Sequence, residues 1–411
     1  MSTTLTLTQM PPRKRPRDIR LDVFRGLCLI IIFLSHVWQN PWAEIIPARF
    51  GFSDATEIFV FCSGMASAIA FGSTFRTHGF MIGAARVLFR CWQVYWAHIG
   101  VFLVAAASMI VVDRWLGTDS AYVQGLGILP LLEGQTRQAL VGLLTLTWVP
   151  NYFDILPMYL VILLLLPVVI SLYEINRYAA LAFVAVTWAI AGFGILDPPA
   201  EPWSTRPWFF NPLSWQLVFF TGFAFMSGWL PTPAVDRRLI GLSAAVLALS
   251  VPLSWWPLLD NVEILARARD ALGPLLDKSR FGVLRYAHFL ALAYLAYVAA
   301  GEGGKRLAGP VADILRKLGQ QSLAIFMTGL VLSFSASAVL NLTGRGLFAA
   351  TLVNAAGIAI LIGVARITAW FKAQPWQQKR DPRPLPDQAT QPARPPAGPK
   401  DKMPLNMKPA R

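Results

Sequence analysis

Two ionisable side chains lie within the first long apolar run of the sequence. Arg25 and His36 are eleven residues apart in this run. On an α-helix with about 100° and about 1.5 Å per residue, this spacing places both side chains on one face, ~16 Å apart along the axis. A histidine can act as a general base, and an arginine can hold an anionic group. The pair is therefore a candidate for catalysis along one helix.

Carboxylates on both sides of this helix extend the candidate site. Asp22 precedes Arg25 by about one turn, so the two are expected to pair. Asp54 and Glu57 open the second apolar run, which starts on the side of the membrane where the first run ends. They are therefore expected to approach His36, where a carboxylate would fix the tautomer of the imidazole and raise its basicity. The competing interpretation is that Asp54 and Glu57 only cap a helix.

Further polar residues at the ends of apolar runs are candidates for substrate binding. Arg86 and Arg90 are four residues apart before the third run, which suits either a phosphate group or anchoring at the membrane surface. Asp154 follows aromatic and amide residues, a pattern that suits a sugar or an ordinary interfacial belt. Arg285 and His288 are one turn apart, where they are expected to hold an anionic acyl tail or to be structural.

The composition indicates which elements must position these residues. Hydrophobic residues make up 55% of the 411 residues and charged residues only 14%, against roughly 25% charged residues in soluble domains. A bilayer span needs roughly 17–25 mostly apolar residues. The fold class is therefore predicted to be an all-α polytopic membrane protein with about ten transmembrane helices. The predicted spans are residues 21–40, 57–75, 91–113, 154–172, 179–196, 212–230, 239–257, 283–300, 321–341 and 347–371.

The distribution of charge predicts how the chain is oriented and divided. Residues 1–20 form a basic segment, residues 21–371 the ten-helix membrane domain, and residues 372–411 a disordered Pro-rich basic tail. An even number of spans places both termini in the cytoplasm, where basic residues gather. Because the net charge of +14 lies mainly in these segments and in short loops, the expected partner is the lipid bilayer and no nucleic acid. The three cysteines show no zinc spacing, and no metal is predicted.

Several segments resemble one known family. The Arg-x10-His spacing of Arg25 and His36 is similar to that of the membrane-bound acyltransferase-3 superfamily. Five segments in order resemble its OpgC branch more closely, over roughly residues 17–370. They are "RDIRLDVFRGLCLIIIFLSHVWQNPWAEIIPARFGFSDATEIFVFCSG" (17–64), "FDILPMYLVILLLLPVV" (153–169), "FNPLSWQLVFFTG" (210–222), "LRYAHFLALAY" (284–294) and "LGQQSLAIF" (318–326).

The resemblance implies a multi-pass enzyme of the bacterial inner membrane that transfers a succinyl group from succinyl-CoA, or from another acyl-CoA, to hydroxyls of a periplasmic glucan. It implies no permanently bound cofactor, and glucan-synthesis proteins as further partners. The superfamily needs its paired arginine and histidine for activity, a requirement that carries over to Arg25 and His36. An Arg-x-x-Arg pair of the superfamily is associated with the donor. Arg86 and Arg90 depart from that spacing by one residue.

The mechanism expected from this topology gives each residue a role, and three other functions remain open. Arg25 steadies the donor, Glu57 orients His36, and His36 deprotonates the sugar hydroxyl or carries the acyl group. An O-acetyltransferase acting on another surface polysaccharide fits the same residues. A transporter or flippase for a polar solute also fits, although the sequence shows no inverted repeat. A structural subunit of a glucan-assembly complex would not need Arg25 and His36.

Overall fold

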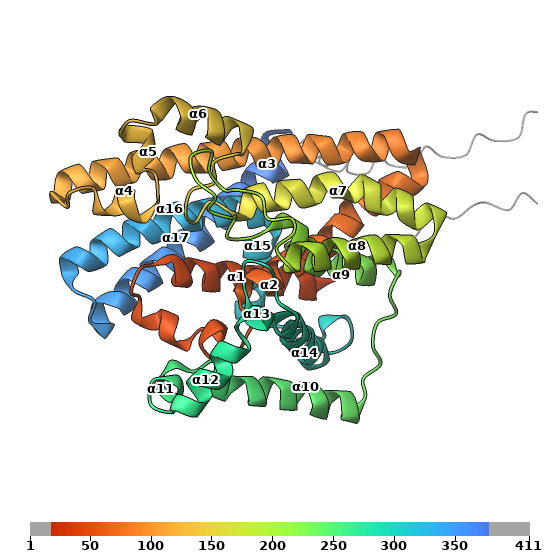
Figure 1. Cartoon of the computed structure of the whole chain (residues 1–411). Coiled ribbons are helices and arrows are strands. Elements are labelled where there is room, and N and C mark those ends of the chain that lie inside the picture. Colours follow the sequence, from red (N-terminus) through yellow and green to blue (C-terminus); the bar gives the residue numbers. More distant parts are fainter. Residues whose placement is uncertain (1–17, 378–411) are drawn as a thin grey trace, which may run out of the picture. The chain divides into compact units, whose positions relative to one another are not determined.

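The computed structural model of the protein describes residues 18–377, and this part of the chain is mostly helical (Figure 1). It contains no β-strand, only an isolated bridge between Pro199 and Pro207. The chain divides into two compact units, residues 1–369 and 370–411. The predicted all-α class is confirmed. Most of the predicted basic segment and of the predicted disordered tail lies outside the described residues.

Each of the ten predicted spans overlaps a helix, although several of the helices are shorter than predicted. The ten helices are α1 (Ile19–His36), α2 (Ala55–Ser67), α3 (Ser73–Leu116), α7 (Ile155–Ile175), α8 (Arg177–Gly192), α9 (Pro212–Ser227), α10 (Arg237–Ser250), α14 (Val283–Ala300), α16 (Ser322–Thr343) and α17 (Leu347–Ala373). Gly79 has non-helical dihedral angles (φ 80°, ψ 177°), so α3 bends there after a short first part. The π-helical turn η3 (Ala68–Gly72) joins α2 to α3.

Five helical stretches in the described range are long and apolar enough to cross a membrane. They are Ala55–Leu116, Ile155–Ile175, Val283–Ala300, Ser322–Thr343 and Leu347–Gln377. The first of these covers two of the predicted spans. The protein is thus a helical membrane protein, whereas ten spans and the cytoplasmic placement of both ends stay predictions.

The connections between these helices contain short helices that hydropathy does not reveal. They are η1 (Pro41–Ile45), η2 (Pro47–Arg49), α4 (Ala121–Gly125), α5 (Leu129–Leu132), α6 (Thr136–Thr145), η4 (Val251–Leu253), α11 (Trp256–Leu259), α12 (Glu263–Ala271), α13 (Gly273–Leu276), η5 (Glu302–Gly304), α15 (Pro310–Gln320) and η6 (Pro375–Gln377). Several begin with a proline in their first turn, a position where the missing N–H group is tolerated.

α1 is shorter than predicted and is surrounded by other helices. It ends at His36 rather than at residue 40, because Gln39 adopts a left-handed conformation (φ 52°) and Pro41 follows. It packs against α2, α15 and α16. A Cβ atom added at Gly26 would overlap the Leu315 carbonyl, and one added at Gly319 would overlap the Asp22 carbonyl. Glycine at both positions therefore lets the backbones of α1 and α15 approach closely.

The close approach of α1 and α15 predicts that Gly319→Ala lowers the melting temperature of the detergent-purified protein. Overpacking of this kind typically costs about 1–3 kcal/mol, whereas alanine in an open helical position is favoured over glycine. Gly363→Ala in α17 is the matched control, because a Cβ atom at Gly363 meets nothing within 4 Å. Equal melting temperatures for the two variants would contradict the proposed tight contact.

Candidate functional site

A cavity of about 720 Å³ lies at the end of α1 where His36 stands. Its walls come from α1, from the segment of η1 and η2, from the start of α2 and of α7, from the loops that precede α9 and α14, and from α16. The volume is within the range of roughly 300–1,000 Å³ that is usual for ligand pockets. Its polar lining residues include His36, Asp54, Asn151, Asp154, Arg206 and Lys278. Segments distant in sequence thus bring a histidine, two carboxylates and three cations (Arg49, Arg206 and Lys278) to one cavity.

His36 is held in a defined tautomer by its own helix. Its Nδ1 lies 2.6 Å from the Ile32 carbonyl oxygen, and a carbonyl only accepts, so Nδ1 carries the proton and donates. The ring of Tyr152 packs edge-on against the imidazole, with the centroids 5.6 Å apart. The second nitrogen, Nε2, therefore keeps its lone pair. A neutral imidazole in this state can accept a proton from a bound hydroxyl group.

Glu57 does not orient His36, so this part of the predicted mechanism is wrong. Its Oε1 accepts hydrogen bonds from Nε and Nη2 of Arg285, at 2.9 and 2.6 Å. Its Oε2 accepts a third hydrogen bond from the Asp54 N–H at 2.8 Å. The side chain is completely buried, and these bonds direct it toward α14 and away from the end of α1. The Ile32 carbonyl sets the tautomer of His36 instead.

Asp54 combines the capping role with a place in the cavity wall. Its side chain accepts a hydrogen bond from the Thr56 N–H at 2.7 Å and forms a capping box with Glu57. Its Oδ2 also lies 2.5 Å from the Lys278 ammonium and 3.6 Å from the Arg285 guanidinium. Burial opposes ionisation, but these two cations hold the pKa of the Asp54 carboxyl well below its usual range. Asp54 therefore favours its charged form in the wall of the cavity that His36 also lines.

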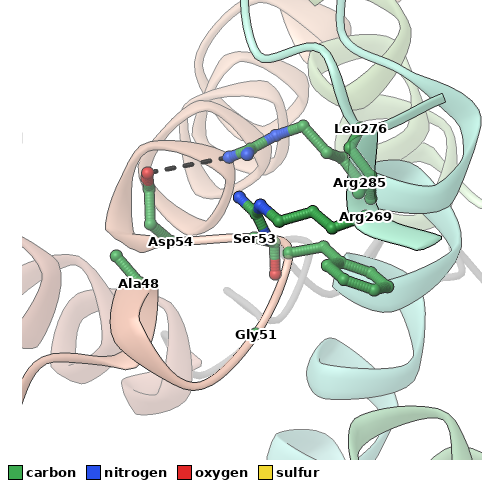
Figure 2. Close-up of a pocket in the computed structure, with 8 residues that line it drawn as sticks. Ala48, Gly51, Ser53, Asp54, Arg269, Leu276 and Arg285 are labelled. Carbon is green, nitrogen blue, oxygen red and sulfur yellow. Dashed lines mark ion pairs between the residues drawn. The ribbon is translucent and has the colours of Figure 1, made fainter. Parts of the chain in front are cut away.

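Arg285 and His288 lie next to the cavity rather than in its lining. Arg285 borders a smaller pocket of about 70 Å³, where its guanidinium lies beside that of Arg269 and across from Asp54 (Figure 2). His288 is buried, and its Nδ1 lies 2.7 Å from the Ser53 hydroxyl and accepts the Ser53 N–H at 3.3 Å. The two predicted residues thus bind to the segment that starts α2. Their predicted contact with an acyl tail stays a prediction.

The expected pair between Asp22 and Arg25 is also wrong. Arg25 donates from Nη2 to the Ser322 hydroxyl at the start of α16. Asp22 accepts a hydrogen bond from Gln320 at 3.3 Å, at the end of α15. Both contacts follow from the close packing of α1 on α15, which turns these side chains toward the junction of α15 and α16. Arg25 does not line the cavity, so the structure places it and His36 at separate positions along α1.

The structure places Asp154 in the cavity lining but Arg86 and Arg90 outside it. Asp154 lines the cavity and is buried, with one carboxyl oxygen that has no hydrogen-bond partner. Burial raises the pKa of Asp154 to about 7, against the opposing charge of Arg206. Arg86 and Arg90 lie on α3, where Arg86 donates to Thr74 at 2.5 Å and Arg90 to its neighbour Gln93 at 3.1 Å. Neither arginine lines the cavity.

Lys278 and Arg206 are cavity residues that sequence reasoning missed. Lys278 belongs to the turn between α13 and α14, and Arg206 to the loop before α9. One signal for Lys278 was present. The segment 258–282 follows seven predicted spans and would therefore lie outside the cytoplasm, yet it holds Arg267, Arg269, Lys278 and Arg280. Basic residues on that side depart from the usual bias of loop charges, which is an indication of function.

Comparison with known families assigns the chain. The sequence profile described as OpgC protein matches residues 17–373. The chain belongs to the OpgC family. Membership implies a glucan-modifying acyltransferase activity. Neither the curated proteins nor the solved structures gave a match.

The buried pair of Glu57 and Arg285 predicts a large effect of Glu57→Gln on stability. Removing one charge from a buried pair typically costs about 3–5 kcal/mol, because the other charge is left without compensation. Thermal unfolding of the detergent-purified protein, followed by circular dichroism, measures the change. Glu263→Gln is the control, because Glu263 pairs with Arg267 where both side chains are more than three-quarters exposed (77% and 76%). Similar shifts for both variants would contradict the role of the buried pair.

Proposed function

We propose that the protein transfers an acyl group, with succinyl as the first candidate, from cytoplasmic acyl-CoA to a hydroxyl group of a periplasmic glucan. The observation that carries the proposal is His36, which faces a cavity of ligand size with its Nδ1 tied to a backbone carbonyl. The family supports an acyltransferase that acts on glucans. The proposed location is the bacterial inner membrane, with the cavity open toward the periplasm.

The reaction is a simple exchange at the thioester carbonyl. Nε2 of His36 accepts the proton of the sugar hydroxyl while the hydroxyl oxygen attacks the carbonyl carbon. The bond between carbon and sulfur then breaks, and the proton passes from His36 to the departing CoA sulfur. The products are a glucan ester and free CoA. In a second route, Nε2 itself attacks the thioester carbonyl, and the bond between carbon and sulfur breaks to release the CoA thiolate. The sugar hydroxyl then attacks the acyl-imidazole, the bond between carbon and Nε2 breaks, and the hydroxyl proton passes to the thiolate, so that the products are again a glucan ester and free CoA.

The acceptor side of the proposed site uses groups in the cavity lining. Asn151 and Asp154 offer hydrogen-bonding groups, and the rings of Tyr152, Trp208 and Phe209 offer apolar surface. A saccharide presents both hydroxyl groups and apolar ring faces, so this mixture suits it. Asp154 would bind a hydroxyl through its carboxyl group.

The donor side of the proposed site lies toward the other end of α1. Arg25 is about 16 Å from His36 along the helix axis, and it contacts Ser322 at the start of α16. In the predicted orientation this position is nearer the cytoplasm, where acyl-CoA is made. Arg25 would hold the donor on its way to the cavity, and Arg86 and Arg90 would attract its phosphate groups at the membrane surface.

The proposal predicts that His36→Ala abolishes ester formation in membranes given labelled succinyl-CoA and glucan. Loss of a general base typically lowers the rate by about 10²- to 10⁴-fold. His78→Ala is the matched control, because His78 is exposed on α3 and contacts the neighbouring Thr77. Wild-type rates of ester formation in His36→Ala membranes would contradict the proposal. So would uptake of a polar solute by the purified protein in vesicles without consumption of acyl-CoA.

A further inference from the structure

We propose that Lys278 selects acyl groups that end in a carboxylate, by binding that carboxylate inside the cavity beside His36. The inference rests on the proposed function and adds the residue that determines donor specificity. A succinyl group carries such a carboxylate two methylene groups away from the reacting carbonyl. Recognition and chemistry therefore occupy different parts of one cavity, with Lys278 and His36 both in its lining.

Hydrogen bonds to two of its backbone carbonyl groups fix the turn that carries Lys278. The Lys278 carbonyl accepts a hydrogen bond from the indole of Trp215 at 2.9 Å, and Trp215 is fully buried in α9. The next carbonyl, that of Ser279, accepts the Asn211 N–H at 3.1 Å. These bonds anchor the backbone against the start of α9. The lysine side chain therefore extends from a rigid base, which suits a specificity residue.

The surroundings of the ammonium group favour an additional anion. The Lys278 side chain is 31% exposed, and its Nζ lies 5.8 and 5.6 Å from the ring centres of Phe209 and Phe210. An ammonium has three donors, and the Asp54 carboxylate accepts one of them. Because charges within a protein cavity are screened less than in bulk water, a carboxylate that reached the remaining donors would bind more strongly than at an open surface.

The other two cations of the cavity are already paired with carboxylates outside its lining. Arg49 binds Glu44 at 2.8 Å, and Arg206 binds Glu201 at 3.1 Å. Each also donates to a backbone carbonyl. Lys278 differs, since its carboxylate partner is part of the cavity wall itself. The geometry therefore favours Lys278 over the two arginines as the group that meets a substrate carboxylate.

Asp54 can pair with cations other than Lys278 when a substrate carboxylate binds. It forms part of both the large cavity and the small pocket of about 70 Å³. Within the small pocket, Arg285 lies 3.6 Å from Asp54, and the Arg269 guanidinium lies beside Arg285 (Figure 2). Asp54 can thus loosen its contact with Lys278 and remain neutralised. An uncharged acyl group offers Lys278 no such exchange and leaves the internal pair intact.

The test compares two donors of the same size on one acceptor. Purified protein in lipid vesicles receives glucan with either succinyl-CoA or succinamoyl-CoA, the amide that lacks the negative charge. The wild type is expected to prefer succinyl-CoA in kcat/KM by roughly 10- to 100-fold, the range expected for a hydrogen bond to a charged group. Lys278→Met should remove most of this preference, and Lys278→Arg should keep it. Lys305→Met, in an exposed pair with Glu302, is the control and should behave as the wild type.

Three results of this comparison would overturn the inference. A Lys278→Met variant that discriminates as strongly as the wild type would overturn the inference, as would a wild type that does not discriminate at all. Equal loss with both donors in Lys278→Met would also overturn it, because such loss indicates a general structural or catalytic role. If the wild type transfers neither acyl group, the proposed function itself fails. Gel filtration of each variant shows whether it is folded.

Discussion

Glu57 and Arg285 meet where a single charge would be energetically unfavourable, since Glu57 is completely buried and Arg285 nearly so. Their contact joins the start of α2 to α14. It also fixes the position of Asp54, whose N–H binds Glu57 and whose carboxylate lies between Arg285 and Lys278. One wall of the cavity beside His36 is therefore built on this ion pair. Loss of either charge would leave the other without compensation and disturb that wall.

α1 supplies the other requirement of the proposed site, which is a rigid connection between the position of Arg25 and the position of His36. Its close contact with α15 through Gly26 and Gly319 leaves little freedom for rotation or sliding. Arg25 is thereby held against Ser322, while His36 ends the helix at the cavity. The donor and acceptor sides of the proposed reaction thus share one helix. Packing that appears purely structural determines where the chemistry can take place.

The sequence predicted the long helices and the presence of Arg25 and His36 in one of them, but not the partners of the charged side chains. Periodicity specifies which face of a helix a residue occupies, and both Arg25 and His36 do lie in α1. It does not specify how neighbouring helices rotate, which is why Glu57 was assigned to His36 rather than to Arg285. Lys278 was missed because it lies in a turn and is 224 residues from Asp54, its partner. Hydropathy also does not reveal short helices such as α15.

The central claim is that α1 serves a reaction whose donor and acceptor are on opposite sides of the membrane. Sealed inverted vesicles test it most directly, with the glucan enclosed and labelled succinyl-CoA added outside, at the cytoplasmic face. Vesicles that carry the wild-type protein should contain labelled glucan ester, and vesicles that carry His36→Ala should contain none. Ester formation that requires donor and glucan on the same side of the membrane would contradict it.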